Sequence, residues 1–497
     1  MAEMRCPLTL AAERYGDQAA LIDHDVTVTW LQTESAVGHL AGFLADSGVQ
    51  AGDRVAVVEN NRLELLILIL ALVRVGAIGV LLSPRYPEAT LAQMAEKVGC
   101  RYHVFSSRRT REARLPSLKS ICLPAIAEFL YADKSNGNVV EHVSLNADQP
   151  TTIVFTSGTT GSPKAALLSY GNHYYNALGS NVNLPVSPGD RWLLSLPLYH
   201  VGGLGVLFRC MLGGGTMVLA DTSVTLYDQI ARDRITHLSL VPTQLRRLLD
   251  DPRFELSSST LKVILLGGAS ITAALLSDAV RKRMPVYLTY GLTEMASQVA
   301  TGGAAQPLAP QVLPHREMSI ADNGEILVRG ETLFAGYVEN GSIACPLDSQ
   351  GWFHTGDLGS IDHDGALTVT GRKDNMFISG GENIQPEQIE AALTAIDGIR
   401  DALVVPVEDR EYGHRPVAFV RCDENISLSD PQSIMSESER FRFDYVSLSN
   451  ELSRTLPRFM IPVAIYPWPH DYEASGIKAD RQFFRELAEK LYRSHIR

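Results

Sequence analysis

A stretch of glycines, hydroxyl side chains and one lysine at positions 156–164, TSGTTGSPK, has the composition of a phosphate-binding loop. It follows the apolar run Thr151–Phe155, which predicts a buried strand. Glycines allow tight turns that expose backbone N–H groups, and the hydroxyls and the ammonium add donors for phosphate oxygens. The spacing differs from that of a Walker A loop, and a flexible Gly/Thr turn is the alternative to a phosphate site. The candidate ligands are Thr156, Ser157, Gly158, Thr159, Thr160, Gly161 and Lys164.

Further short motifs with potential chemistry follow this loop along the chain. A glycine pair after the run Lys262–Leu266 would let a flat ring approach the backbone at the carboxyl edge of a parallel sheet. Glu294 could hold a hard cation, and the carboxylate of Asp357 could accept two hydrogen bonds at once. Taken singly, each has a plain structural alternative, such as a turn glycine, a solvated glutamate or a β-turn aspartate. The motifs are LPLYH (196–200), GGA (267–269), YGLTE (290–294), HTGDL (354–358), GRKD (371–374), SGGE (379–382) and GIKADR (476–481).

In this order, the loop and the motifs resemble those of the acyl-adenylate-forming enzymes, which include acyl-CoA synthetases, adenylation domains and luciferases. The resemblance implies a ligase with ATP, Mg²⁺ and coenzyme A as cofactors. It implies that a carboxylate attacks the α-phosphorus of ATP and releases pyrophosphate, a step of positioning and electrostatics. A thiol would then attack the acyl-adenylate and release AMP. An oxygenase of the luciferase type is formally open, although no residue indicates it.

The resemblance also assigns roles in a nucleotide site. Tyr290 would stack on adenine, and Thr293 would bind the α-phosphate. Glu294 would hold Mg²⁺, while Asp357 would take both ribose hydroxyls. Besides the loop at 156–164, the implied nucleotide ligands are Gly267, Gly268, Ala269, Tyr290, Gly291, Asp357 and Arg372, and the implied catalytic residues are Lys478, Thr293, Glu294 and His200.

The last part of the chain resembles the portion that the family uses to change conformation. Asp374 would lie at the hinge about which a small domain rotates, and Gly380 and Gly381 would lie in the loop that lines the thiol tunnel. Lys478 takes the place of the catalytic lysine, because Arg481 keeps its spacing. The family usually has glycine directly before that lysine, whereas an isoleucine stands here. A surface lysine in a non-catalytic nucleotide-binding homologue is therefore the alternative.

Several stretches are most similar to the o-succinylbenzoate–CoA ligases of menaquinone biosynthesis: 193–205, 240–249, 265–271, 379–390 and 412–419. That acid carries two carboxylates, and the one that does not react needs a permanent positive partner, best supplied by arginine. Arg209 occupies a position that is basic in this subfamily, with a surface ion pair as the alternative. The implied substrate residues are His200 as the gate, Arg209, Ser270 and Ser297. Another aryl or acyl acid, or a carrier-protein thiol as acceptor, would suit the same chemistry.

The composition bounds the class of protein and its partners. The 497 residues are 45% apolar and 20% charged, which excludes a collagen-like or wholly disordered chain. A net charge of −12 without a long basic run argues against a nucleic-acid partner. Six widely spaced cysteines predict reduced thiols and a cytoplasmic location, and the first fifteen residues lack a signal-peptide pattern. A homodimer is left open.

The elements that must position these residues alternate along most of the chain. Short Val/Ile/Leu runs, each followed by a turn and a helical period, predict βαβ units with mostly parallel sheets. Short alternating strands near Ala321–Arg329 and Gly365–Gly371 predict a small antiparallel barrel or a small antiparallel sheet. The apolar run Leu65–Val73 is followed at once by Arg74, which predicts a buried helix and then a strand, without membrane insertion.

The expected fold class is α/β with two domains. Residues 1–371 would form an N-terminal adenylation domain of stacked, mostly parallel sheets flanked by helices, plus the small antiparallel barrel, with the ATP and acid sites. Helices at 385–395 and 481–492 and strands at 400–406 and 415–421 predict a compact α+β unit of ordinary domain size. Residues 372–497 would thus form a small mobile C-terminal domain that carries Lys478.

Overall fold

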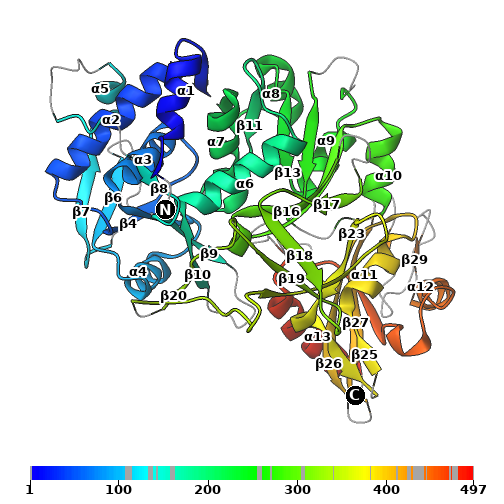
Figure 1. Ribbon diagram of the computed structural model, residues 1–497. Helices are drawn as coiled ribbons and strands as arrows, with labels where there is room; N and C mark the ends of the chain where they lie inside the picture. The colour runs from blue at the N-terminus through cyan, green and yellow to red at the C-terminus, as the bar shows by residue number, and fades with distance from the viewer. Residues whose placement is uncertain are drawn as a thin grey trace.

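The alternating apolar runs fold into two large, mostly parallel sheets, a four-stranded antiparallel sheet and a five-stranded sheet near the C-terminus (Figure 1). The structure is a computed structural model that describes residues 3–106, 115–131, 138–141, 144–156, 163–254, 260–268, 271, 273–303, 308–339, 341–380, 382–409, 412–422, 427–428, 442–443, 445–469, 472 and 479–495. The predicted α/β class is confirmed.

The first large sheet holds the strands on either side of the predicted phosphate loop. In spatial order its strands are β21 (Ser342–Ala344), β20 (Gly336–Glu339), β10 (Lys164–Ser169), β9 (Pro150–Thr156), β5 (Ile78–Leu82), β4 (Arg54–Val58), β6 (Tyr102–Ser106) and β7 (Lys119–Leu123). The last five are parallel to one another, whereas β10 returns antiparallel to β9. In that ladder Lys164 lies opposite Thr156, so the two ends of the loop meet.

The second large sheet brings three of the other motifs, LPLYH, GGA and YGLTE, to its carboxyl edge. In spatial order its strands are β17 (Pro310–Val312), β16 (Ser297–Gly302), β15 (Val286–Leu292), β14 (Val263–Leu266), β13 (His237–Leu240), β11 (Arg191–Leu194), β12 (Thr216–Leu219), β2 (Ala19–Asp23) and β3 (Val26–Thr29). The run from β15 to β2 is parallel, and its central strands β14, β13, β11 and β12 are largely buried because helices cover them. The glycine pair follows β14, and YGLTE ends β15.

Helices fill the space between the two large sheets. Helix α6 (Tyr170–Asn183) contacts both β10 in the first sheet and β16 in the second, and α7 (Val201–Gly213) packs on α6. The capping box at Ser169 and Asn172 begins α6, and the amide of Asn172 also donates to the carbonyls of Glu331 and Leu333. The remaining helices are α1 (Pro7–Tyr15), α2 (Trp30–Asp46), α3 (Leu63–Val75), α4 (Glu88–Lys97), α5 (Ile126–Leu130), α8 (Leu226–Asp233), α9 (Pro242–Asp250), α10 (Ala273–Arg281), α11 (Pro386–Thr394), α12 (Tyr445–Leu452) and α13 (Arg481–His495).

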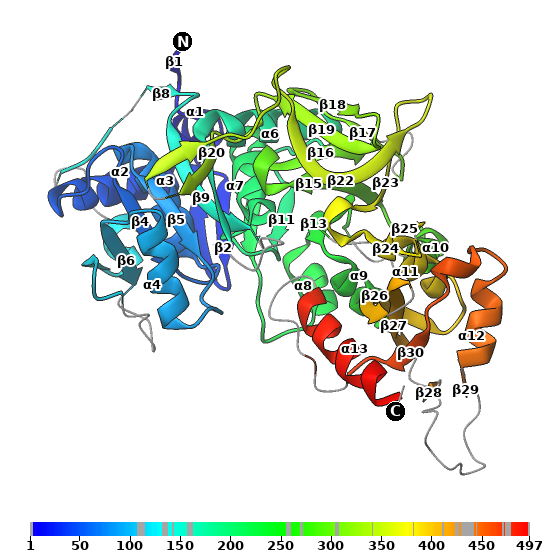
Figure 2. The ribbon, with the colours of Figure 1, turned by 90° about the horizontal axis from the view of Figure 1, so that it is seen from below.

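Two smaller sheets complete the molecule. The antiparallel sheet consists of β18 (Arg316–Ile320), β19 (Glu325–Gly330), β22 (Phe353–Ile361) and β23 (Leu367–Arg372). After it come β24 (Phe377–Ser379), β25 (Glu382–Ile384), β26 (Ile399–Asp409), β27 (Gly413–Cys422) and β30 (Ala464–Pro467). These last strands gather with α11, α12 and α13 at one end of the molecule, away from β4 and β6, in both views (Figures 1 and 2). Two short pairs remain, β1 (Glu3–Met4) with β8 (Leu145–Asn146) and β28 (Ser427–Leu428) with β29 (Arg442–Phe443).

Most predicted elements appear within two residues of their expected ends. One strand expected at 191–196 stops at Leu194. The amide of Asn61 explains the early end, because it donates to the carbonyls of Leu194 and Leu196 and takes this segment out of the ladder. The strand expected at 400–406 is longer, since β26 pairs with β27 along its whole length.

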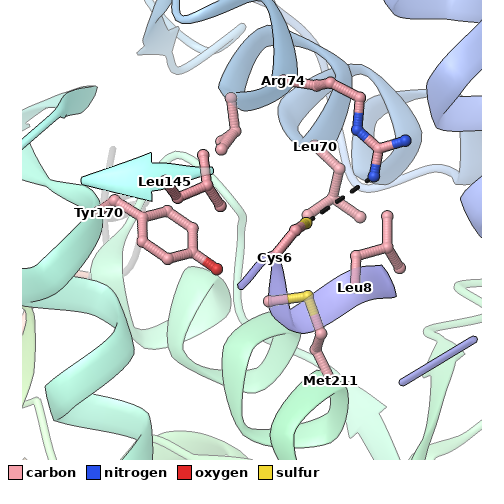
Figure 3. Close-up of a pocket in the computed structure, with 8 residues that line it drawn as sticks. Cys6, Leu8, Leu70, Arg74, Leu145, Tyr170 and Met211 are labelled. Carbon is pink, nitrogen blue, oxygen red and sulfur yellow. Dashed lines mark hydrogen bonds between the residues drawn. The ribbon is translucent and has the colours of Figure 1, made fainter. Parts of the chain in front are cut away.

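The apolar run at 65–73 is a buried helix followed by a buried strand, as predicted. Its arginine, Arg74, lies inside and forms an ion pair with Glu34 at 2.6 Å. Figure 3 shows Arg74 directed toward Cys6, whose sulfur lies 3.8 Å from Nη2. Arg74 and Cys6 line a small cavity. The other labelled residues around it are Leu8, Leu70, Leu145, Tyr170 and Met211. All six cysteines are free thiols, and no helix of the described residues is long and apolar enough to cross a membrane.

The Glu34–Arg74 pair gives a prediction about stability. The substitution Glu34→Gln leaves the buried guanidinium without an anionic partner and should lower the free energy of unfolding by about 3 kcal/mol. Urea unfolding followed by tryptophan fluorescence measures the change. The control is Arg493→Gln, which breaks a pair with Glu408 whose side chains are 70% and 68% exposed. That change should be below about 1 kcal/mol, and equal effects of the two substitutions would contradict the prediction.

Candidate active site

The carboxyl edge of β14 and β15 is shaped by glycines that serve the protein's own packing. A Cβ atom at Gly267 would lie 2.6 Å from Thr289 Cγ2, and one at Gly291 would lie 2.0 Å from the carbonyl oxygen of Ser297. Gly268 has a positive φ of 82°, and among the described residues a Cβ there would meet only Val241, at 3.6 Å. Strand packing thus requires glycine at positions 267 and 291, whereas the described neighbours of Gly268 leave more room.

The carboxylate of Asp357, on β22, is held by two side chains from different parts of the chain. The hydroxyl of Tyr290 donates to one oxygen at 2.7 Å, and Arg372 Nη1 donates to the other at 2.8 Å. Burial and the negative charge of Asp357 raise the pKa of the Tyr290 phenol well above its usual value, so the phenol stays protonated. The carboxylate keeps lone pairs free on both oxygens and is held rigidly, which suits it to accept two further hydroxyl groups.

A second cluster of side chains surrounds Glu294, which follows Tyr290 closely in the sequence. This glutamate sits in the short helix η2 (Thr293–Met295) directly after β15 and is 9% exposed. The hydroxyl of Tyr337 donates to Glu294 at 2.6 Å, and the ammonium of Lys164 lies 5.2 Å from the centre of the Tyr337 ring. Through Tyr337 the structure therefore brings Glu294 to the end of the predicted phosphate loop. Within the part of the chain that is described, no three His, Cys, Asp or Glu residues cluster as metal ligands. A cation at Glu294 would take most of its oxygens from a ligand such as a polyphosphate.

The segment after β23 joins these clusters to the C-terminal sheet. Arg372 also faces Asp374, at 3.4 Å, within the short helix η3 (Lys373–Asn375). The amide of Gln385 donates to the carbonyl of Arg372 at 2.9 Å, and the same amide contacts Glu387. Gly380, at the end of β24, has a φ of +58°, and its N–H donates to the carbonyl of Tyr412. Asp374 is thus close to the Asp357 cluster, whereas Gly380 belongs to the C-terminal sheet.

Nine predicted site residues lie outside the described part of the chain. They are Ser157, Gly158, Thr159, Thr160, Gly161, Ala269, Ser270, Gly381 and Lys478. Their roles stay predictions.

His200 begins α7 and lies at the end of a turn held by another side chain. Asn61 accepts from the N–H of Leu198 at 2.8 Å, which completes the contacts that this asparagine makes with the LPLYH segment. The ring of Tyr199 packs edge-on against His200, with ring centres 4.9 Å apart. Burial, with a contribution from the charge of Arg85, lowers the pKa of His200 to about 4. The imidazole is therefore neutral near pH 7 and suits an apolar wall better than an anion site.

Arg209 lies on α7, and its side chain is completely buried. Its Nη2 lies 3.5 Å from the hydroxyl of Ser297, and its guanidinium carbon lies 5.4 Å from the ring centre of Trp192. No carboxylate of the described residues comes within 4 Å of the guanidinium, and Nε has no hydrogen-bond partner there. The alternative interpretation from the sequence, that Arg209 forms an ion pair at the surface, is therefore wrong. Burial lowers the pKa of Arg209 to about 10, which still leaves it charged at neutral pH.

The backbone next to Ser297 is strained. Ala296 has a φ of +56° and Ser297 a φ of +130°, both unusual for residues with a side chain. The amide of Asn176 on α6 donates to the carbonyls of Met295 and Gln298 and so holds the turn from both ends. This conformation aims Ser297 at Arg209, which places the two predicted acid-site residues together.

Three residues that hold the site residues in place lie outside every motif of the sequence analysis. Asn61 shapes the turn before His200, Tyr337 joins Lys164 to Glu294, and Asn176 holds the turn at Ser297. Asn61 could have been suspected, because it lies just after a predicted parallel strand, where polar residues often line a site. For Tyr337 and Asn176 the sequence holds no such signal, since their partners are far away in the chain.

Comparisons with known proteins agree with this geometry. Residues 8–338 match the family model described as AMP-binding enzyme. The chain is 34% identical over 481 residues to a 2-succinylbenzoate–CoA ligase of Escherichia coli (strain K12), with 96% of each chain covered.

Solved structures show the same similarity. The o-succinylbenzoate CoA synthetase of Bacillus subtilis in complex with the acyl-adenylate intermediate OSB-AMP superposes with a TM-score of 0.83 at 27% identity, over 98% of this chain and 99% of that chain. The same synthetase in complex with ATP and magnesium ion gives a TM-score of 0.81 at 28% identity, over 97% and 99% of the two chains.

The half-buried imidazole of His200 gives a prediction about pH. Its pKa is about 4 in the folded protein, against about 6.5 in an unfolded chain, so the unfolded state takes up the proton first as the pH falls. The corresponding stability is present above about pH 6.5 and is lost as the pH falls toward 4, by at most about 3 kcal/mol. The substitution His200→Gln should remove this contribution and flatten the dependence of unfolding free energy on pH. His363→Gln, at a side chain that is 88% exposed, is the control; the same slope in wild type and His200→Gln would refute the prediction.

Proposed function

The chain belongs to the family of AMP-binding enzymes, and from that premise we propose that it is an o-succinylbenzoate–CoA ligase that forms AMP and serves menaquinone biosynthesis. It activates o-succinylbenzoate with ATP as an acyl-adenylate and then transfers the acyl group to coenzyme A. ATP, Mg²⁺ and coenzyme A are its cofactors, as expected from the motifs. Two similarities support this assignment. The chain resembles a 2-succinylbenzoate–CoA ligase over nearly its whole length, and it superposes on a synthetase solved in complex with OSB-AMP.

The observation that best supports this acid is the buried guanidinium of Arg209. A buried cation without a carboxylate partner is costly in the empty protein and is stabilised by an anion that enters the site. A monocarboxylic acid uses its only carboxylate in the reaction, so it has no anion to offer Arg209. A second carboxylate on the substrate supplies one, and Ser297 can donate a further hydrogen bond to it.

The nucleotide is held by the two clusters around Asp357 and Glu294. Asp357, held by Tyr290 and Arg372, accepts the ribose hydroxyls, and the Tyr290 ring lies beside the base. Glu294 would hold Mg²⁺, which neutralises phosphate charge when bound. Lys164 and the loop before it bind the β- and γ-phosphates, and Thr293 donates to the α-phosphate.

In the first half-reaction a carboxylate oxygen of the acid attacks the α-phosphorus, and the bond to pyrophosphate breaks. The protein contributes position and positive charge, because phosphoryl transfer builds up charge on the phosphate oxygens. Lys478 bridges the carboxylate and the α-phosphate. His200, neutral and half-buried, forms part of the wall that keeps water from the acyl-adenylate.

In the second half-reaction the thiolate of coenzyme A attacks the acyl carbon, AMP leaves, and the thiol proton passes to solvent. Residues 372–497 would move as a C-terminal domain about Asp374, withdrawing Lys478 and bringing Gly380 and Gly381 to the thiol path. The hydrogen bond from Gln385 to the carbonyl of Arg372 crosses this joint and would break during the movement.

Small molecules are the partners of this enzyme, with no part for nucleic acid or a membrane. The six free thiols support a cytoplasmic location. We include a homodimer in the proposal as the form in solution, to be measured by light scattering.

A panel of acids tests the proposed substrate. Pyrophosphate release with ATP, Mg²⁺ and coenzyme A should be much faster with o-succinylbenzoate than with benzoate, a medium-chain fatty acid, malonate or acetate. Preference for another acid would keep the two-step chemistry and refute the substrate. Replacing coenzyme A by a phosphopantetheinyl carrier protein distinguishes the acceptors. Binding of ATP without turnover of any acid would favour a non-catalytic homologue.

Lys478 should act in only one half-reaction. The substitution Lys478→Ala should slow formation of the acyl-adenylate by at least ~100-fold, because a charge that stabilises the transition state is lost. Release of AMP from preformed acyl-adenylate and coenzyme A should change little. Lys490→Ala, at an exposed position on α13, is the matched control. Equal loss in both half-reactions would show that the assigned role is wrong.

A further inference from the structure

A second arginine is buried close to the acid site, at the start of β18. Arg316 is 6% exposed, and its Nη2 donates to the carbonyl of Asn176 at 3.4 Å, a long hydrogen bond. Its Nε and Nη1 are buried and have no hydrogen-bond partner among the described residues. A Cβ atom at position 179 would lie 2.5 Å from the carbonyl oxygen of Pro314 and 3.3 Å from Nη2, so Gly179 lets the segment that begins β18 approach α6 closely.

Arg316 and Arg209 approach the same turn from two sides. Arg209 reaches Ser297, and Arg316 reaches Asn176, whose side chain holds the carbonyls on either side of Ser297. The two guanidiniums are close enough to repel each other. Burial, and after it the positive charge of Arg209, lower the pKa of Arg316 to about 9. Two like charges thus share one buried region.

The described part of the chain offers these two guanidiniums no buried counter-ion. Neither forms an ion pair within 4 Å there, and the one carboxylate whose charge raises the pKa of Arg316 is that of Glu331. The Glu331 side chain is 53% exposed and lies 3.7 Å from His315. A distant, hydrated carboxylate compensates a buried charge only weakly.

The surroundings are polar but neutral. Buried atoms without a described partner nearby on α6 and β16 are Asn176 Oδ1, Ser180 Oγ, Asn181 Oδ1 and Gln298 Oε1. Amide and hydroxyl oxygens, or water between them, can satisfy N–H groups of arginine, but they bring no negative charge. An anion is what would balance a region with two guanidiniums.

We propose that Arg316 is a second specificity-determining residue of the acid site, which together with Arg209 binds the substrate carboxylate that is not activated. The carboxylate lies between the two guanidiniums and accepts hydrogen bonds from both. This inference rests on the proposed function, and it narrows the substrate class to acids with a second, fully ionised carboxylate. An uncharged polar substituent at that place would leave both cations without a partner.

The test compares two acids on three variants. o-Succinylbenzoate has both carboxylates, and β-benzoylpropanoate lacks the ring carboxylate. In Arg316→Gln, the KM for o-succinylbenzoate should rise by at least ~10-fold, the usual size of a lost charged hydrogen bond. The KM for β-benzoylpropanoate should change by less than ~2-fold, and the KM for ATP should not change. Arg316→Lys, which keeps the charge, should recover part of the loss.

Arg329→Gln is the matched control, since Arg329 lies on the neighbouring strand β19 and its side chain is 37% exposed. It should leave the KM for both acids unchanged. An equal loss for both acids in Arg316→Gln would show a structural role and overturn the inference, as would no loss for either. Absence of turnover of o-succinylbenzoate by the wild-type enzyme would instead refute the proposed function.

A measurement on the wild-type protein covers the case in which Arg316→Gln does not fold. With ¹⁵N-labelled arginine, o-succinylbenzoate should shift the Nε–H resonances of two buried arginines, and β-benzoylpropanoate should shift neither. A shift of one resonance alone would assign the carboxylate to Arg209 and remove Arg316 from the site.

Discussion

The carboxylate of Asp357 is the point on which the arrangement of the site depends. One oxygen accepts from Tyr290, at the edge of the second large sheet, and the other accepts from Arg372, where the antiparallel sheet ends. The carbonyl of Arg372 in turn accepts from Gln385, at the start of the C-terminal part. Asp357 and its two partners therefore join the second large sheet to the antiparallel sheet, and Gln385 joins these to the C-terminal part. Because charge-assisted hydrogen bonds are short and directional, they fix these sheets more tightly than apolar contacts would.

Residues whose role is local could be predicted, and residues whose role depends on distant contacts could not. The strands, the β9–β10 turn and the YGLTE segment follow from apolar runs and turn residues, and the α/β class follows from their alternation. The burial of Arg209 could have been predicted from the sequence, because this arginine lies in a helix that is otherwise apolar. The role of Tyr337 could not be predicted, because its hydroxyl and ring contact Glu294 and Lys164 only once β20 is in place in the folded sheet. Gly267 was expected to face a ligand, but the structure shows that it also makes room for Thr289.

The region around Arg209 and Arg316, which we propose as the acid site, holds its charges in an unusual way for a protein interior. His200 is kept neutral by burial, whereas Arg209 and Arg316 remain cationic without a carboxylate of the described chain beside them. Burying such groups costs folding free energy, and the strained turn at Ala296 and Ser297 costs more. The large apolar core around α3 and α7 supplies the stability that offsets these costs. The site can therefore be prepared for its ligand before the ligand arrives.

The pairing of the two ends of the predicted phosphate loop has a consequence for how the gene can vary. Thr156 and Lys164 face each other across the β9–β10 ladder, so the seven residues from 157 to 163 must span a gap of one fixed width. Lengthening a loop by one residue costs little entropy. A residue inserted inside β10 would instead move every following side chain of that strand to the opposite face of the sheet, unless a bulge absorbed it. Descendants of this sequence can therefore gain or lose a codon between positions 157 and 163 far more readily than within β10.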